Sequence, residues 1–313
     1  MSKRLAYTLT LLSILLIALT IAKLVEVKGP SEIKNLISTE VFMEKPELNT
    51  TIAIEDTIRI AGYFDFMDSL ICTYDSLTDY PLSEHVLVNA NPWIIDTLAH
   101  TDYYTMIKRD SFIFDQRSMI VLRPIDTLLV PDTQEAKSIL EAFAKTWIDV
   151  NLPEYTLRIY QDSSLLLSVP IRIGQNRSKY LKMADKITDL KTKTGKGHIV
   201  GFRKNPAFYN PVTGKKFQYT RRDDGSTTLM PQIPWLETEI NGIKNGQLIH
   251  PTTNPETLQK AYSNGCIGVK EADAWLIYYH CPLGTPIQIR YDLKIRNANG
   301  SMTLLEDIYH LGS

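Results

Sequence analysis

A cysteine and a histidine are the side chains of this sequence best suited to covalent chemistry. His250 ends a run of β-forming residues, and Cys266 follows 16 positions later, at the end of the turn-like run Ser263-Asn264-Gly265-Cys266. A thiol attacks a carbonyl only as the thiolate, so its pKa of about 8.5 must be lowered by a nearby base or cation, usually a histidine. The pattern therefore favours Cys266 as a nucleophile and His250 as its base.

A glycine before the nucleophile would let the chain turn tightly and bring a substrate close. The backbone N–H groups of Gly265 and Cys266 would then be able to donate hydrogen bonds to an oxyanion. A cysteine and a histidine nevertheless occur together in most chains, and a buried structural cysteine is the commoner case. On residue types and spacing alone, a catalytic pair and a structural pair both remain open.

The remaining cysteines and histidines favour structural roles. Three cysteines, Cys72, Cys266 and Cys281, cannot form a complete disulfide framework, so at least one thiol is free or pairs between chains. Cys281 is predicted to be a core or helix-end residue, His280 a cation at a helix C-terminus, and His198 a structural residue with a cleft-lining position as the alternative. The sequence has no paired zinc-ligand spacing and no glycine-rich phosphate loop, so it predicts no metal and no organic cofactor.

The charges are sorted along the chain although the net charge is only −1, which gives no sign of nucleic-acid binding. Residues 30–140 carry 18 acidic and 8 basic side chains, whereas residues 177–222 carry 13 basic and 2 acidic ones, a balance of +11. Two explanations of the basic segment are open. It is either a solvated face or a surface that concentrates an anionic substrate near the chemistry.

The first 24 residues are typical of a targeting segment. Lys3 and Arg4 precede an uncharged stretch of 18 residues, 5–22, which Lys23 ends. This stretch is just long enough to span a bilayer, is long for a cleavable signal, and is followed by no good cleavage site. A signal anchor in the inner membrane is favoured over a cleaved signal peptide. Either one places the body outside the cytoplasm, in the periplasm or cell envelope.

The length of 313 residues predicts two structural units. A polar, weakly periodic tether is expected over 25–56, followed by an α+β accessory domain over 57–132. The end of that domain, DTLLVPD, resembles the closing strand of LysM glycan-binding modules, with an unrelated accessory domain as the alternative. Asp132 and Glu135 have the spacing of a capping box, which predicts a connecting helix over 133–146.

The downstream part, 147–292, is predicted to be mainly β. The runs WIDVNL, YTLRIYQ and LLLSVPIRIG are rich in β-forming residues and are separated by turn residues. The sequences DDG and KNG further along predict two hairpin turns. A short helix is expected after the cap Asn254, and a second one over 270–279. Residues 293–313 are expected to be a C-terminal tail.

Together these features resemble the L,D-transpeptidase family, which has a YkuD-type catalytic domain. That family combines a strand-end histidine with a later S/T-x-G-C and an aliphatic residue, here His250 and the run SNGCI. NLPEYTLRIYQ, SVPIRIG, KTKTGKGHI and GTPIQIRYD resemble further strands and motifs of the family, so the match covers 147–292. The resemblance implies an L,D-transpeptidase-like β-sandwich with short helices.

Four positions depart from the family pattern. Asn264 stands where the family most often has histidine, Pro251 where it has glycine, and Lys193 where it has proline. Gly268 stands where the family has an arginine that is thought to hold substrate or order the site. Basic residues of 177–222 are the candidates to replace that arginine, and the sequence leaves open which one does so.

The resemblance also implies a reaction on peptidoglycan. His250 would take the thiol proton, and Cys266 would attack the carbonyl of the third residue of a tetrapeptide stem and release D-Ala. A second stem, as acceptor, would resolve the thioacyl enzyme to a 3→3 crosslink. Gly265 and Cys266 would bind the oxyanion, while Ser263, with its neighbour Asn264, would support the turn.

Further expectations follow from the same resemblance. Such a cysteine site would be sensitive to carbapenems, which mimic the donor. Two other functions remain open: an L,D-carboxypeptidase or wall-remodelling peptidase of the same fold, and a non-catalytic cell-wall-binding protein.

Overall fold

The computed structural model describes residues 51–297 and 299–311 of the chain. All of them belong to one unit, which the chain forms from Asn49 onward. The expected signal segment, 1–24, lies outside the described residues, as does most of 25–56. Among the described residues, no helix has the length and apolar character needed to cross a membrane.

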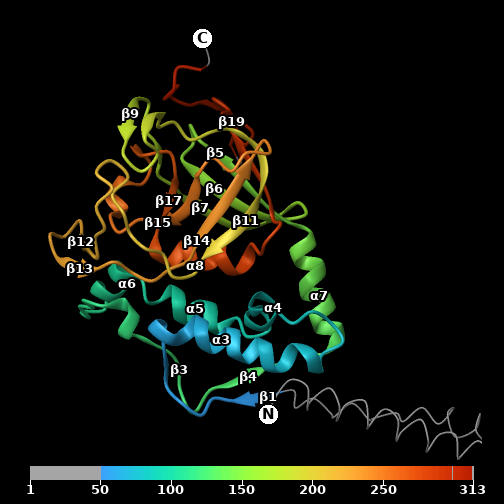
Figure 1. Cartoon of the computed structure of the whole chain (residues 1–313). Coiled ribbons are helices and arrows are strands. Elements are labelled where there is room, and N and C mark those ends of the chain that lie inside the picture. The colour runs from blue at the N-terminus through green and yellow to red at the C-terminus, as the bar shows by residue number, and fades with distance from the viewer. Residues whose placement is uncertain (1–50, 298, 312–313) are drawn as a thin grey trace, which may run out of the picture. The chain divides into compact units, whose positions relative to one another are not determined.

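The first part of the described chain consists of helices and two short antiparallel ladders (Figure 1). Its elements are β1 Thr51–Ala53, β2 Ile58–Arg59, α3 Ile60–Tyr74, η1 Asp75–Leu77, α4 Glu84–Asn89, α5 Trp93–Ala99, α6 Tyr103–Ile107, η2 Gln116–Ser118, β3 Ile120–Leu122 and β4 Thr127–Leu129. Strand β1 pairs with β4, and β2 pairs with β3. The buried residues of α3 recur at helical spacing, so this helix turns one apolar face inward.

The start of this part differs from the expectation. Strand β1 lies within the segment 25–56 that was interpreted as a tether, so folded structure begins before residue 57. A strand of three residues, TIA, is too short to show a periodic pattern. The sequence DTLLVPD supplies β4, and its resemblance to a LysM strand stays a prediction.

Helix α7, Thr133–Ala144, leads from the helical part to the sheet. As the capping-box spacing predicted, the Asp132 carboxylate accepts a hydrogen bond from the Glu135 N–H at 2.8 Å. Strand β5, Thr146–Asn151, begins almost directly after the helix ends.

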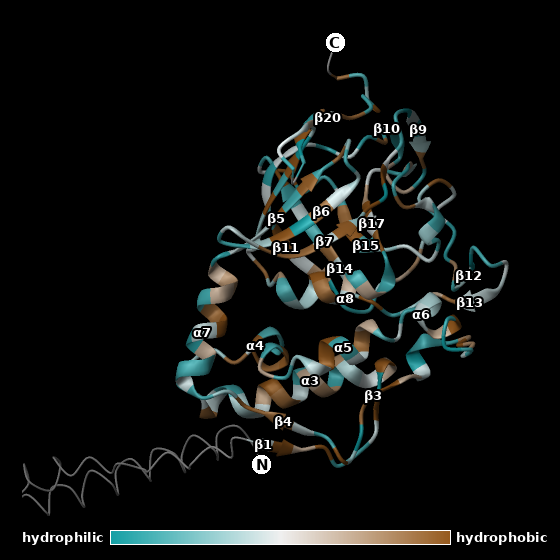
Figure 2. Cartoon of the chain, turned by 180° about the vertical axis from the view of Figure 1, so that it is seen from behind, coloured by the Kyte–Doolittle hydropathy of each residue, from teal (hydrophilic) through white to brown (hydrophobic). Residues whose placement is uncertain are grey.

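The centre of the downstream part is one eight-stranded mixed sheet in the order β17-β15-β14-β11-β18-β5-β6-β7. The other strands of the sheet are β6 Thr156–Gln161, β7 Ser164–Pro170, β11 Gly195–Arg203, β14 Trp235–Ile240, β15 Leu248–Pro251, β17 Ile267–Val269 and β18 Pro286–Arg290. The pairs β15–β17 and β18–β5 are parallel. Hydrophobic residues gather on β15 and β17 and on α5 (Figure 2). The prediction of a mainly β domain is confirmed.

Short ladders surround this sheet. Their strands are β8 Ile173–Gly174, β9 Ser178–Leu181, β10 Lys186–Asp189, β12 Tyr219–Arg221, β13 Thr227–Leu229, β16 Ala261–Ser263, β19 Lys294–Arg296 and β20 Met302–Leu304. The predicted DDG turn joins β12 to β13, and the predicted KNG turn joins β14 to β15. Strand β16 pairs in parallel with β8, which brings the end of LLLSVPIRIG next to the cysteine-bearing turn.

The two predicted helices of the downstream part have different outcomes. After Asn254 the chain forms only the 3₁₀ turn η3, Pro255–Thr257. The Asn254 side chain does not cap it, because its carbonyl oxygen accepts instead from the Thr253 hydroxyl at 2.9 Å. Its amide nitrogen donates to the Arg221 carbonyl at 3.0 Å and the Asp223 carboxylate at 2.9 Å. The second helix is confirmed as α8, Glu271–His280. It is buried on most sides rather than on one face, since α5 and β15 both contact it.

The helical part and α8 share one buried core. The Tyr63 and Tyr279 hydroxyls lie 2.8 Å apart, and the Tyr279 hydroxyl donates to the Glu84 carboxylate at 2.8 Å. Lys204, at the end of β11, forms an ion pair with Glu84 at 2.8 Å. Side chains from both sides of residue 132 therefore stabilise each other, and the expected boundary of an accessory domain falls inside a common core.

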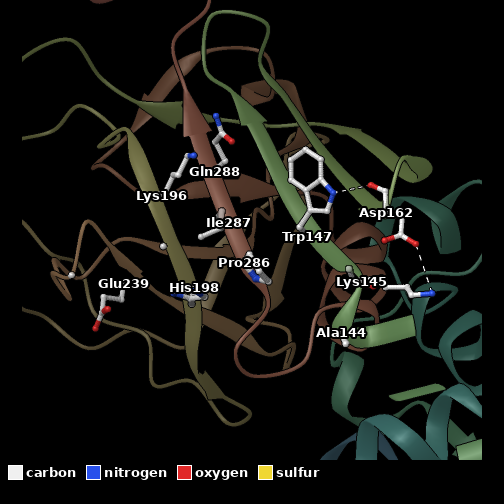
Figure 3. Close-up of a pocket in the computed structure, with 13 residues that line it drawn as sticks. Ala144, Lys145, Trp147, Asp162, Lys196, His198, Glu239, Pro286, Ile287 and Gln288 are labelled. Atoms are coloured by element: carbon white, nitrogen blue, oxygen red, sulfur yellow. Dashed lines mark hydrogen bonds and ion pairs between the residues drawn. The ribbon is translucent and has the colours of Figure 1, made fainter. Parts of the chain in front are cut away.

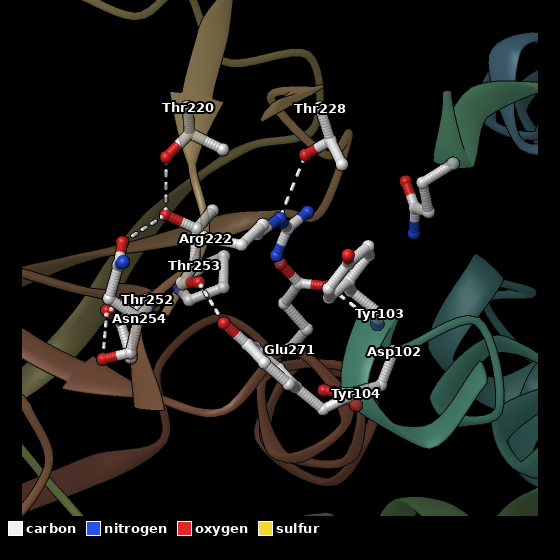
Figure 4. Close-up of polar contacts among 12 residues, drawn as sticks. Asp102, Tyr103, Tyr104, Thr220, Arg222, Thr228, Thr252, Thr253, Asn254 and Glu271 are labelled. Carbon is white, nitrogen blue, oxygen red and sulfur yellow. Dashed lines mark hydrogen bonds and ion pairs between the residues drawn. The ribbon is translucent and has the colours of Figure 1, made fainter. Parts of the chain in front are cut away.

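A second buried link joins α8 to the β12–β13 hairpin (Figure 4). The Arg222 guanidinium and the Glu271 carboxylate form an ion pair and are 4% and 2% exposed. Arg222 also donates to the Thr228 hydroxyl at 2.8 Å and lies 4.4 Å from the centre of the Tyr103 ring. The Glu271 carboxylate also accepts from the Tyr103 N–H at 3.1 Å. The hairpin is thus fixed to the helical part by a charge pair that water does not reach.

The C-terminal segment is more than a tail. Strands β19 and β20 pair with each other, and Tyr309 is buried at 3% exposure. Its ring stacks on that of Tyr291 with centroids 5.5 Å apart. The described part of this segment therefore contributes to the folded domain through β19, β20 and Tyr309.

Removing one partner of the buried ion pair Arg222–Glu271 should lower the free energy of unfolding. Glu271→Ala leaves the Arg222 guanidinium buried without its anion, and we expect the free energy of unfolding in urea to fall by about 3–5 kcal/mol. The double variant Arg222→Met/Glu271→Leu should lose less than Glu271→Ala alone, because it buries no unpaired charge.

An exposed pair provides the control for this comparison. Lys137 and Glu141 lie 4.0 Å apart with side chains 76% and 60% exposed. Glu141→Ala should change the free energy of unfolding by less than about 1 kcal/mol. Equal losses for Glu141→Ala and Glu271→Ala would contradict the role assigned to the buried pair.

Candidate active site

Two neighbouring strands bring Cys266 and His250 together. Strand β15 pairs in parallel with β17, with Ile249 opposite Ile267 and His250 opposite Gly268. Cys266 directly precedes β17, level with Leu248 in this register, so the thiol-bearing residue lies two positions along the ladder from His250. The parallel pairing therefore converts a separation of 16 positions in the sequence into proximity in space.

The Cys266 thiol is half-buried at the end of β17. Its sulfur lies 3.9 Å from the Gly246 carbonyl oxygen, to which it donates. Burial raises the pKa of the thiol, while a hydrogen bond from the Leu248 backbone and the positive charges of Arg172 and Arg203 act in the opposite direction. The balance favours a protonated thiol at rest, so a base is needed for attack.

His250 is held as a neutral ring. Its Nδ1 lies 2.8 Å from the Pro251 carbonyl oxygen. Since a carbonyl only accepts, Nδ1 carries the proton and Nε2 keeps the lone pair of the neutral ring. Burial, followed by the charge of Arg172, lowers the pKa of His250 to about 4, so the ring is neutral near pH 7. The Trp235 ring packs on it with centroids 5.1 Å apart.

The nucleophile turn is closed by Ser263. The Ser263 hydroxyl donates to the Cys266 carbonyl at 2.6 Å and accepts from the Gly265 N–H at 3.2 Å. Gly265 has φ = +113°, a conformation that requires glycine. The Gly265 N–H, which was expected to face an oxyanion, is thus already engaged within the turn. Asn264 is exposed.

A brace behind the turn was not predicted from the sequence. The Thr192 hydroxyl donates to the Gly265 carbonyl at 3.0 Å and accepts from the Gly174 N–H at 2.8 Å. The Tyr309 hydroxyl donates to the Gly174 carbonyl at 2.7 Å and accepts from the Thr192 N–H at 3.2 Å. A Cβ at Gly174 would lie 1.9 Å from the Leu190 carbonyl oxygen, so only glycine fits there. Thr192 belongs to the family-like run KTKTGKGHI, whereas Tyr309 carried no sequence signal.

A hollow of about 530 Å³ lies on the far side of Trp235, and its wall does not include His250 or Cys266. Its wall includes Met183, Arg203, Tyr209 and Trp235, and Trp235 is the residue that packs on His250.

The other candidate residues lie elsewhere. His198 lines a separate hollow of about 700 Å³ with Trp147 and Glu239 (Figure 3), whose wall includes neither Cys266 nor His250. Cys281 is fully buried, as predicted. His280 was expected to be a cation, but burial lowers its pKa and favours the neutral ring. Within 51–297 and 299–311, no cluster of potential metal ligands occurs.

Several cations of the basic segment 177–222 are paired internally. Besides the buried Arg222, Lys193 pairs with Asp189, Arg203 with Glu237, and Lys204 with both Asp68 and Glu84. Part of the positive charge therefore stabilises the fold, and a role of the segment in attracting substrate stays a prediction.

Residues 145–289 match the YkuD family, the L,D-transpeptidase catalytic domain. This segment is an L,D-transpeptidase domain. It contains the nucleophile turn, both strands of the reactive pair and most of the brace. No curated protein matched the chain in sequence.

Three solved structures illustrate the similarity to other L,D-transpeptidases. One from Mycobacterium smegmatis is 14% identical, with 47% of this chain and 58% of that chain covered and a TM-score of 0.33. One from Xylanimonas cellulosilytica is 13% identical, with 66% and 94% covered and a TM-score of 0.33. L,D-transpeptidase 3 from Mycobacterium tuberculosis, solved with a faropenem-derived adduct, is 14% identical, with 47% and 60% covered and a TM-score of 0.31.

These similarities are partial. The chain spans little more than half of the first and third of these structures. Since the TM-scores are low, the assignment to the L,D-transpeptidase family rests on the sequence match over 145–289.

The brace should stabilise the L,D-transpeptidase domain and its nucleophile turn. Thr192 is 2% exposed, so Thr192→Val leaves the Gly265 carbonyl and the Gly174 N–H buried without a partner. We expect the free energy of unfolding to fall by about 1–3 kcal/mol, and the rate of Cys266 alkylation by iodoacetamide to change. Thr192→Ser keeps both hydrogen bonds and should remain closer to the parent in both measurements. Equal behaviour of the Val and Ser variants would show that the hydroxyl has no such role.

Proposed function

We propose that this L,D-transpeptidase domain forms 3→3 crosslinks in peptidoglycan through a thioacyl intermediate on Cys266. The observation that carries the proposal is the hydrogen bond from His250 Nδ1 to the Pro251 carbonyl, which leaves Nε2 free to accept a proton on the strand beside the thiol. The assignment of the segment 145–289 to the family supports the choice of substrate.

The first half of the reaction is acylation of Cys266. His250 Nε2 takes the thiol proton, and the sulfur attacks the carbonyl carbon of the third residue of a tetrapeptide stem. The carbonyl oxygen becomes an oxyanion. Because the Gly265 N–H already donates to Ser263, we assign the oxyanion to the Cys266 N–H. As the peptide bond breaks, the D-Ala amine leaves with the proton from His250, and a thioester remains.

The second half transfers the acyl group to an acceptor. The amine of another stem attacks the thioester and gives its proton to His250, and the carbon–sulfur bond breaks. The proton returns to the sulfur, which restores the starting state. Water in place of the amine would release a free carboxylate, the outcome of a carboxypeptidase or peptidase. No step requires a metal or an organic cofactor.

The proposed substrate implies a location outside the cytoplasm. The apolar stretch 5–22 after Lys3 and Arg4 supports export, with the stretch itself as a membrane anchor. Fractionation of cells that produce the full chain tests this part of the proposal.

The reactive pair can be tested on purified sacculi by muropeptide analysis. Cys266→Ala and His250→Ala should each abolish the new products, because the first removes the nucleophile and the second its base. Cys72→Ser should keep full activity, because Cys72 is exposed on α3, and Cys281→Ser should keep most of it. Crosslinked products with full activity in Cys266→Ala would refute the mechanism.

The same analysis distinguishes the alternatives. Shortened stems without crosslinks would identify a carboxypeptidase, and loss of existing crosslinks a wall-remodelling peptidase. Sacculi that are bound but chemically unchanged would identify a cell-wall-binding protein.

A carbapenem should acylate the protein at one position. The strained lactam carbonyl is open to the same thiolate attack, so intact-mass measurement should show one adduct in the parent and in Cys72→Ser, and none in Cys266→Ala. An adduct that persists in Cys266→Ala would place the nucleophile elsewhere.

A further inference from the structure

Arg172, in the short connection between β7 and β8, lies against the residue two positions after the nucleophile. Its N–H donates to the Gly268 carbonyl at 2.8 Å, and the Gly268 N–H donates to the Arg172 carbonyl at 2.9 Å. On its other side Gly268 is paired with His250. The main chain thus holds Gly268 between the proposed base and an arginine.

The guanidinium of Arg172 occupies the space that a side chain at position 268 would need. A Cβ built on Gly268 lies 2.9 Å from Arg172 Nε and 3.3 Å from its second terminal nitrogen. Such distances are too short for any residue other than glycine unless the guanidinium moves. Gly268 is itself buried, so the guanidinium has little room to shift.

This guanidinium is only partly satisfied. One terminal nitrogen donates to the Thr257 hydroxyl at 3.1 Å, but Nε is buried without a hydrogen-bond partner. Throughout 51–297 and 299–311, no carboxylate forms an ion pair with Arg172. A buried cation without an anion is unfavourable, so the site is suited to a negative charge that arises during the reaction.

The anion that the surroundings offer is the Cys266 thiolate. The ionisable groups whose charges act on this site are the thiol itself, His250 on β15, Arg203 on β11 and Tyr262 on β16. We propose that Arg172 is the cation that stabilises the Cys266 thiolate, and that position 268 is glycine because the guanidinium fills its side-chain space. This inference rests on Cys266 being the nucleophile of the proposed function.

In this proposal Arg172 takes the place of the arginine that the family has at the position of Gly268. The basic segment 177–222 was expected to supply it, but Arg172 precedes that segment. A residue from a neighbouring stretch of backbone thus places its charge above position 268. The sequence could not show this, because the bridge between Arg172 and Gly268 joins residues 96 positions apart.

The test measures the rate of Cys266 alkylation by iodoacetamide as a function of pH, in the full chain with Cys72→Ser. The midpoint of that curve reports thiolate formation. Arg172→Gln should move the midpoint upward by about one unit or more and slow alkylation at pH 7 about tenfold, because the stabilising cation is gone. Arg172→Lys should keep most of the effect, and Arg177→Gln, at an exposed position, should match the parent.

A double-mutant cycle tests the steric half of the inference. Gly268→Ala should move the midpoint in the same direction as Arg172→Gln, because the added methyl group displaces the guanidinium. In the Arg172→Gln background, Gly268→Ala should add little. A midpoint in Arg172→Gln equal to that of the parent, or fully additive shifts in the cycle, would overturn the proposal.

This readout is independent of peptidoglycan. If Arg172→Gln raises the alkylation midpoint but the parent protein leaves sacculi unchanged, the inference stands and the proposed function is refuted. If Arg172→Gln does not fold, as judged by circular dichroism, Arg172→Lys and Gly268→Ala decide the matter. Arg172→Lys should then preserve the alkylation midpoint, and Gly268→Ala should raise it. The reverse pattern would overturn the proposal.

Discussion

The site depends on a constraint at Gly268, whose main chain lies between strand β15 on one side and the segment that carries Arg172 on the other. His250 is its neighbour in the β15–β17 ladder, and Arg172 exchanges two hydrogen bonds with it on the opposite side. The absence of a side chain lets the guanidinium lie against the main chain. The proposal therefore assigns acid–base or electrostatic roles to three groups that surround one short backbone segment: the Cys266 thiol, the His250 imidazole and the Arg172 guanidinium.

The nucleophile turn is held by segments that are far apart in the chain. Ser263 closes it from within, whereas Thr192, Gly174 and the C-terminal Tyr309 brace it from behind. Each of these hydrogen bonds is buried or partly buried, so breaking one would leave a polar group unsatisfied. The positive φ of Gly265 costs little, because glycine has no Cβ.

The helical part supports the site from a third direction. The buried pair Arg222–Glu271 fixes the β12–β13 hairpin to α8, and Asp223 in the same hairpin binds Asn254, three residues after Pro251. The segment that follows the histidine is thus tied to the helices through the hairpin. A buried ion pair of this kind gives little net stability by itself, but it allows few alternative arrangements.

Local sequence patterns predicted the mainly β domain, helices α7 and α8 and the hairpin turns, which the structure confirms. They also singled out Cys266 and His250, whose catalytic roles stay a prediction. These features depend on local patterns, such as alternating apolar residues, a cap before a helix or a glycine before a cysteine, and a local pattern is visible in one stretch of chain. The folded structure was needed to see the common core of the helical part and α8, the brace of Thr192 and Tyr309, and the position of Arg172 over Gly268. Each of these contacts joins residues that are distant in the sequence, and its energy comes from burial and hydrogen bonds that exist only once the chain has folded.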